Sequence, residues 1–157
     1  MVKVNILAVG RVKEKYFAEG ISEYAKRIGK FASFSLIEIA EENFTKVDDK
    51  IIEIIKEREC ERILQHLKGV VFALAMEGKK FSSESFAKEM KTLIDKGEGV
   101  ITFVIGGSYG LDNRVKERAD KLISFSDMTF PHTMFRLMLT EQIYRAFTIN
   151  TGSNYHK

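Results

Sequence analysis

The sequence has one cysteine, one proline, no tryptophan and no long hydrophobic run. A lone Cys60 forms neither an internal disulfide nor a thiolate metal site by itself, so we expect a reducing, cytoplasmic location. Apolar runs such as Val70–Met76 are far shorter than the roughly 20 residues that a membrane span requires. The opening Met1–Leu7 has no charged region followed by a long apolar stretch, so we expect neither a signal peptide nor a membrane partner.

The sequence also lacks a large excess of charge of one sign. Its 157 residues carry 25 Lys plus Arg against 22 Asp plus Glu, and the net charge of +3 permits an RNA or phosphate partner without requiring one. Twelve Phe and five Tyr supply bulky core material, which excludes a disordered chain. No linker, repeat or low-complexity segment divides the chain, so we predict a single domain over residues 1–157.

Short apolar runs alternate with amphipathic segments along the chain. Because the runs are continuously apolar, we predict an α/β fold with a parallel sheet that is covered by helices on both faces. Asp48 or Asp49, Ser82 or Ser83, and Asp112 are suitable helix caps. The predicted strands are residues 2–9, 34–40, 70–75, 100–105 and 122–126, and the predicted helices are about 17–28, 49–67, 83–96, 113–121 and 134–149.

Three predicted strands are followed by unusual residues, and ligands of open parallel sheets bind beyond the carboxyl ends of the strands. Ala75–Lys79 follow the third strand, Gly106–Gly110 the fourth and Phe125–His132 the fifth. The glycine run matches neither a dinucleotide fingerprint nor a P-loop, and it is either a ligand-binding loop or a tight turn. The last segment is rich in hydrogen-bonding groups that could recognise an adenine or a ribose, or it is a capped turn.

The last predicted helix and the tail carry further candidates. Arg136 and Arg145 are spaced to point to opposite sides of that helix, so one could bind phosphate while the other pairs with an acid, or both lie at the surface. Tyr155 and His156 stand where tails usually fray, which favours a tail that folds over a site. Since the helix is apolar on several faces, we predict dimerisation.

Five stretches form a specific set in their order and spacing: the opening Ile6–Gly10, Phe103–Gly110, Ser124–His132, Glu141–Ala146 and the ending Tyr155-His156. Together they resemble the ribosomal large-subunit pseudouridine methyltransferase H family of the SPOUT class, and the match covers essentially the whole chain. Arg11 stands where that family often has Lys, which keeps the charge.

The resemblance implies a Rossmann-like domain with a C-terminal trefoil knot, working as a homodimer, although true knots are essentially absent from folds in general. It implies S-adenosyl-L-methionine as the methyl donor, no metal, and a pseudouridine of 23S rRNA that is methylated at N3 on the assembled ribosome. Carried over by position, the donor-binding residues are Leu74, Gly106, Phe125, Ser126, Asp127, Met128, Thr129 and Phe130.

The chemistry that the resemblance implies needs a group that removes the N3 proton, or a positive charge that favours the anion. An imidazole titrates near neutral pH, so we predict His156 as the base. We predict that Tyr155 stacks on or orients the target base and that Arg145 holds a phosphate or a ring oxygen. The site is then composite, with the donor pocket of one protomer completed by the tail of the other.

Arg11, Lys13, Lys15 and Lys79 are candidate phosphate ligands, with surface solubilisation as the simpler role of each. Two alternatives stay open: a SPOUT methyltransferase that acts on tRNA, and a non-catalytic RNA-binding or ribosome-associated protein of the same fold. A dinucleotide-dependent oxidoreductase is disfavoured because no fingerprint follows the first strand.

Overall fold

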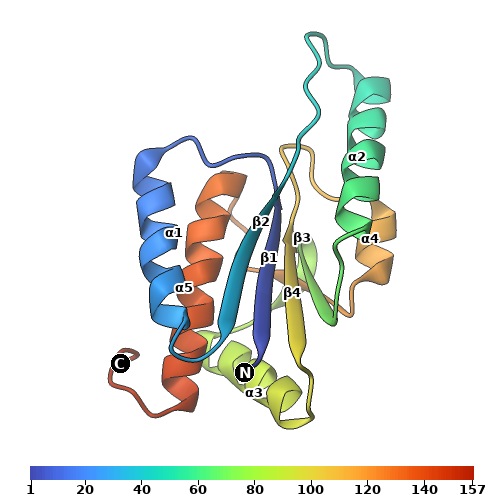
Figure 1. The fold of residues 1–157 in the computed structure, drawn as a ribbon. Helices are drawn as coiled ribbons and strands as arrows, with labels where there is room; N and C mark the ends of the chain where they lie inside the picture. Colours follow the sequence, from blue (N-terminus) through green and yellow to red (C-terminus); the bar gives the residue numbers. More distant parts are fainter.

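The short apolar runs of the sequence form the central parts of the strands of one parallel sheet. A computed structural model describes residues 1–157, and in it the strand order is β2-β1-β4-β3-β5 with every pairing parallel (Figure 1). The predicted parallel α/β sheet is therefore confirmed. The strands are β1 (Lys3–Val9), β2 (Ser33–Ile39), β3 (Val70–Lys80), β4 (Val100–Ile105) and β5 (Lys121–Ser124).

The alternation of side chains along β1 divides the core into two layers. Val4, Ile6 and Ala8 pack in the cluster that includes residues of α1, α3 and α5, whereas Leu7 and Val9 pack in the cluster of α2 and α4. Helices therefore cover both faces of the sheet, as predicted. The helices are α1 (Lys15–Ile28), α2 (Asp49–Leu64), α3 (Ser83–Asp95), α4 (Asn113–Arg118) and α5 (His132–Asn150).

Three helices begin at capping residues that the sequence predicted. A cap satisfies backbone N–H groups that have no partner within the first turn of the helix. The side chains of Asp48, Ser82 and Asp112 accept hydrogen bonds from the backbone N–H groups of Ile51, Ser85 and Arg114, at 2.8, 3.0 and 2.9 Å.

Several predicted ends were wrong by a few residues. Helix α2 stops at Leu64 instead of Leu67, α4 stops at Arg118, and β5 ends at Ser124. Helix α5 begins at His132 instead of Met134, because Pro131 provides a helix-compatible entry that needs no N–H partner.

The third strand differs most from its prediction, since it continues to Lys80 instead of ending at Ala75. Leu74 and Lys79 both pair with Ile123, so the residues between them leave the ladder as a loop. Gly78 lies in that loop, where a Cβ atom would stand 2.5 Å from the carbonyl carbon of Ile123. Only glycine fits at this crossing of β3 and β5.

Helix α5 runs from the edge of the sheet where the strands end to the edge where they begin (Figure 1). At its start, Arg136 contacts the carbonyl oxygen of Val9 at the end of β1. At its end, Asn150 donates a hydrogen bond to the carbonyl oxygen of Ala87 in α3. The C-terminal tail therefore lies at the opposite edge from the loops that follow the strands.

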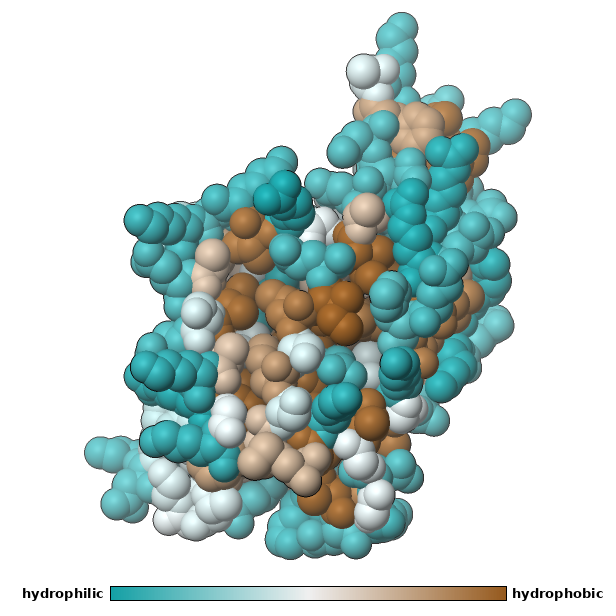
Figure 2. Space-filling view, in the orientation of Figure 1, coloured by the Kyte–Doolittle hydropathy of each residue, from teal (hydrophilic) through white to brown (hydrophobic).

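Apolar side chains also reach the surface along the edge strand β2. Its Phe34, Leu36 and Ile37 are half-buried, and Figure 2 shows hydrophobic atoms gathered between the more hydrophilic helices on either side. No helix of the structure is long and apolar enough to cross a membrane.

Candidate active site

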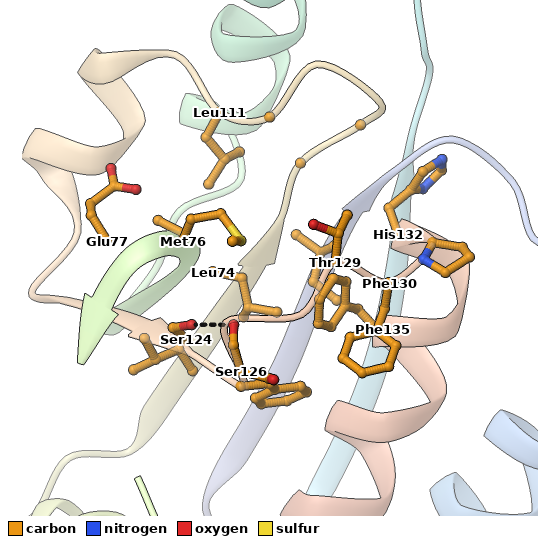
Figure 3. Close-up of a pocket in the computed structure, with 18 of the residues that line it drawn as sticks. Leu74, Met76, Glu77, Leu111, Ser124, Ser126, Thr129, Phe130, His132 and Phe135 are labelled. Atoms are coloured by element: carbon orange, nitrogen blue, oxygen red, sulfur yellow. Dashed lines mark hydrogen bonds between the residues drawn. The ribbon is translucent and has the colours of Figure 1, made fainter. Parts of the chain in front are cut away.

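The part of β3 that leaves the ladder and the loops that follow β4 and β5 converge on one cavity of about 490 Å³ (Figure 3). Its volume lies within the range of pockets that bind small molecules and cofactors. Leu74 and Met76 line it from β3, Leu111 from the segment after β4, and Thr129 and Phe130 from the segment after β5. The prediction that these three strand ends share a ligand site is thus consistent with the fold.

Six of the eight predicted donor-binding residues line this cavity. They are Leu74, Gly106, Phe125, Ser126, Thr129 and Phe130. The other two do not line it: Asp127 forms an ion pair with Lys80 and its side chain is 87% exposed, and Met128 is 71% exposed. The backbone N–H of Met128 donates to Ser126 Oγ at 3.0 Å, which holds the loop in a turn.

The glycine run after β4 is both a tight turn and a wall of the cavity. The N–H of Gly110 donates to the carbonyl oxygen of Gly107 at 3.1 Å, and Gly110 has a φ of 80°. A Cβ atom on Gly106 would stand 2.9 Å from the carbonyl carbon of Gly110. The two alternatives that the sequence left open are therefore compatible, because the turn itself brings the backbone to the cavity.

His132 borders the cavity at the first residue of α5. Its Nδ1 atom is buried and has no hydrogen-bond partner. Burial, and then the positive charge of Arg136, lower the pKa of His132 below its ordinary value. The ring is therefore neutral at neutral pH and presents an uncharged wall to the cavity.

Arg136 lies one turn further along α5, and its side chain is completely buried. Its Nη2 donates to the carbonyl oxygen of Val9 at 2.7 Å, and its Nη1 donates to Glu38 Oε2 at 3.1 Å. The same carboxylate oxygen accepts the backbone N–H of Val12 at 3.0 Å. Arg136 therefore ties the start of α5 to β1, β2 and the loop after β1. Of the two arginines of α5, it is the one that pairs with an acid from a fully buried position.

The three predicted catalytic residues, Arg145, Tyr155 and His156, come together around Glu141. Arg145 Nε and the Tyr155 hydroxyl donate to Glu141 Oε1 at 2.9 and 3.0 Å. The Arg145 guanidinium also lies 4.8 Å from the centre of the Tyr155 ring. Burial, followed by hydrogen bonds to Tyr24 and Glu141, raises the pKa of Tyr155 well above its ordinary value, so its hydroxyl stays protonated.

The contacts of His156 determine which ring nitrogen carries the proton. Arg145 Nη1 lies 3.0 Å from His156 Nδ1, and because a guanidinium only donates, Nδ1 accepts. Nε2 then carries the proton and donates to Glu84 Oε1 at 2.7 Å. His156 has no free basic nitrogen in this arrangement, so it can act as a base only after its contact with Arg145 is exchanged.

The tail residues do not reach the cavity of their own chain. They lie at one end of α5 and the cavity lies at the other (Figure 1). Arg145 and Tyr155 contact Glu141, which stands nine residues after His132 on this helix, or about 14 Å at about 1.5 Å per residue. One chain therefore contains both halves of the predicted site without joining them.

A family model described as predicted SPOUT methyltransferase matches residues 2–156. The chain belongs to the SPOUT methyltransferase family. Two relatives named ribosomal RNA large subunit methyltransferase H are similar over their full length. The protein of Lactobacillus gasseri is 49% identical over 159 residues, and that of Streptococcus thermophilus is 48% identical over 162 residues, each covering 99% of this chain and 100% of the relative.

Solved structures support the SPOUT fold independently of close sequence similarity. A probable methyltransferase from Bordetella pertussis Tohama I superposes with a TM-score of 0.57 at 14% identity, over 92% of this chain and 96% of that one. The tRNA (m1G37) methyltransferase from Aquifex aeolicus superposes with a TM-score of 0.50 at 16% identity, over 92% of this chain and 69% of that one. At these sequence identities, the similarity shows only that this chain shares the SPOUT fold.

Three acidic residues of this SPOUT family member were missed by the sequence reasoning. Glu141 holds the tail, and its place one turn before Arg145 was the available signal. Glu77 pairs with Lys116 at 2.7 Å and both line the cavity. Glu59 is buried beside the glycine run, and burial raises its pKa.

Proposed function

We propose that this SPOUT family member transfers the methyl group of S-adenosyl-L-methionine to N3 of a pseudouridine in 23S rRNA on the assembled ribosome. The observation that carries the proposal is the cavity at the ends of β3, β4 and β5, in a chain about half identical to methyltransferases named for large-subunit rRNA. We infer that residues 1–157 act as one catalytic domain.

The walls of the cavity suit the two parts of the proposed donor. Apolar side chains, among them Leu74, Leu111 and Phe130, provide flat contacts for a purine ring. Ser126, Thr129 and the backbone of the glycine run provide polar groups for the edges of the base and for the ribose.

The donor, when bound there, supplies an electrophilic methyl group on a sulfonium sulfur. We assign its binding to the six lining residues named above. For Asp127 and Met128 we assign only backbone roles in the same loop, since their side chains point away from it.

We infer a homodimer because Arg145, Tyr155 and His156 do not line the cavity of their own chain. If two α5 helices pack antiparallel, the end of one lies beside the start of the other, since each helix is about 28 Å long. The tail of a second copy would then approach the cavity of the first. The several apolar faces of α5 favour such a helix pair.

We also propose that the trefoil knot lies where the chain after β5 passes the loop of β3. The tight contact of Gly78 with the backbone of Ile123 supports this placement, since two chain segments cross there without room for a side chain.

The tail residues have suitable groups for the proton that must leave N3. Once Nδ1 of His156 is released from Arg145, it can accept this proton. Nε2 keeps its own proton and continues to donate it in the hydrogen bond to Glu84, whose carboxylate stabilises the resulting imidazolium. Arg145 is then free to bind the ring oxygen on which negative charge develops. Tyr155, with its hydroxyl held by Glu141, orients the base.

The proposal is tested by incubating the protein with radiolabelled S-adenosyl-L-methionine and, separately, with ribosomes, free rRNA and tRNA. We expect label in 23S rRNA of ribosomes, mapped to N3 of one pseudouridine. Label in tRNA, or none in any RNA, would contradict the proposal.

A pair of glycine variants links the activity to the cavity. Gly106→Ala places a Cβ against Gly110 and should weaken donor binding, whereas Gly99 has no atom within 4 Å of its added Cβ, so Gly99→Ala should not. Equal donor affinities of the two variants, measured by calorimetry, would argue against donor binding in this cavity.

A further inference from the structure

Large apolar side chains are exposed at few places on this molecule, and half of them surround the cavity. Met76, Tyr109 and Met128 are 59, 41 and 71% exposed: Met76 lines the cavity from β3, whereas Tyr109 and Met128 do not line it but stand next to the lining residues Ser108 and Thr129. We call these three residues the rim. Scattered apolar residues on a surface are ordinary, but three at one mouth form a small apolar surface continuous with the cavity.

Two of the rim residues, Tyr109 and Met128, stand in hydrogen-bonded turns. Tyr109 stands in the turn closed by the hydrogen bond from Gly110 to Gly107, and its neighbour Ser108 lines the cavity. Met128 stands in the turn in which its own N–H donates to Ser126 Oγ. The side chain of Met76 points toward the cavity in Figure 3. The apolar surface is therefore present before any partner binds.

The charges around the strand ends favour an anionic partner. The acids of these loops are engaged: Glu42 pairs with Arg62, Glu77 with Lys116, Asp112 with Arg114, and Asp127 with Lys80. Asp48 caps α2, and Glu14 and Glu41 face the buried pair His132 and Arg136.

The cations of the same edge are free. Arg11, Lys13 and Lys46 are exposed and have no carboxylate within 4.0 Å. Arg11 and Lys13 belong to the loop that Glu38 and Arg136 fix beside the start of α5, next to the cavity. Free positive charge therefore stands near the start of α5, where His132 lines the cavity.

We propose that the rim is a stacking platform for unpaired RNA bases next to the target nucleotide, while Arg11 and Lys13 contact the phosphates of the same strand. This inference rests on the proposed function and names the surface that takes its substrate. Every base has an apolar face that stacks on an aromatic ring or a thioether, whatever its sequence. A protein partner would leave the free cations without a counterpart, whereas an RNA strand pairs bases with the rim and phosphates with the cations.

The test compares two tyrosines that are both exposed. Tyr109→Ser removes a ring of the rim, and Tyr16→Ser removes a ring at the start of α1 that is not on it. We expect Tyr109→Ser to raise the KM for ribosomes about fivefold or more while the donor Kd stays within about twofold of the wild type. Tyr109→Phe should restore the wild-type value, and Tyr16→Ser should keep it.

Further outcomes separate this inference from the proposed function. A wild-type chain that methylates ribosomes while Tyr109→Ser equals it would overturn the rim assignment alone. No methylation of any RNA by the wild type would overturn both.

Two results would show that the rim serves another purpose. If Tyr109→Ser or Met128→Ser dissociates a dimer in sedimentation equilibrium, the rim contacts a second copy and the inference is wrong. If Met128→Ser weakens the donor Kd and leaves the KM for ribosomes unchanged, Met128 belongs to the donor pocket and not to the rim.

Discussion

Both ends of α5 carry an arginine that donates to a glutamate, but the two pairs differ in what they connect. Arg136, at the cavity end, is 0% exposed and bonds to β1 and β2. Arg145, at the tail end, is 24% exposed and bonds to Glu141 one turn earlier on the same helix. The Arg136 pair fixes the positions of helix and strands, whereas the Arg145 pair lies within one helix and holds only the side chains of the tail.

This difference between the two ends of α5 corresponds to the two parts of the proposed site, the donor cavity and the tail residues. The donor cavity is complete within one chain and is held by buried contacts between elements. Tyr155 and His156 are held by side-chain hydrogen bonds that are partly exposed and can be exchanged without disturbing the sheet. Under the proposed function, the donor half is preorganised, and the half proposed to meet the substrate base is assembled when the two copies and the RNA come together.

The largest expected effect is on turnover at the tail end. His156→Ala removes the proposed base, so we expect methyl transfer to slow by about 10²- to 10⁴-fold while the donor Kd stays close to that of the wild type. Initial rates with ribosomes and calorimetry with the donor measure the two quantities. His66→Ala, in the exposed turn after α2, is the matched control and should keep both. Normal turnover of His156→Ala would refute the assignment.

The next effect is on stability at the cavity end. Arg136→Ala leaves the carbonyl oxygen of Val9 unpaired and a hole beside it, so we expect the free energy of unfolding to fall by about 3 kcal/mol. Arg145→Ala removes a pair within one helix and should cost less than about 1 kcal/mol. Urea denaturation measures both. Equal losses of unfolding free energy in the two variants would show that the buried pair contributes no more to stability than the pair within the helix.

The elements that the sequence predicted well are those with strong local signals. The strand of residues 100–105 is apolar except for Thr102 and is followed by a glycine, and its observed bounds are identical to the prediction. The convergence of three loops followed from the rule that parallel strands place their carboxyl ends at one edge. Six of the eight residues that the resemblance assigned to donor binding line the cavity, since they stand at the same strand ends.

The features that the sequence did not predict depend on long-range contacts. The loop in β3 arises because Leu74 and Lys79 both pair with Ile123, which no local pattern in residues 70–80 reveals. The burial of Glu59 depends on the glycine run packing against α2. The partners of Arg136 come from the first two strands, far from it in sequence. Local periodicity carries no information about such pairings.

A smaller effect tests how the tail is held. Glu141→Gln keeps an acceptor for Arg145 and Tyr155 but removes the negative charge, so we expect turnover to fall about tenfold, as a general positioning contact would imply. The loss of the carboxylate should also let Tyr155 ionise at lower pH, since Glu141 contributes to its raised pKa. Ultraviolet absorbance during alkaline titration detects this change. Glu89→Gln, in another ion pair, is the control and should show neither effect.

The smallest effect is the pH dependence of stability at the cavity end. The pKa of His132 is lowered in the folded chain, chiefly by burial, so the unfolded chain binds a proton that the folded chain does not. Stability from this source is present above the unfolded pKa and is lost as the pH falls through about 6.5 toward the lower folded value. His132→Asn removes the titrating group, and its denaturation midpoint should fall less steeply than that of the wild type on acidification through this window. Parallel curves would show that His132 is protonated equally in both states, and the cavity end would then lack the uncharged wall assigned to it.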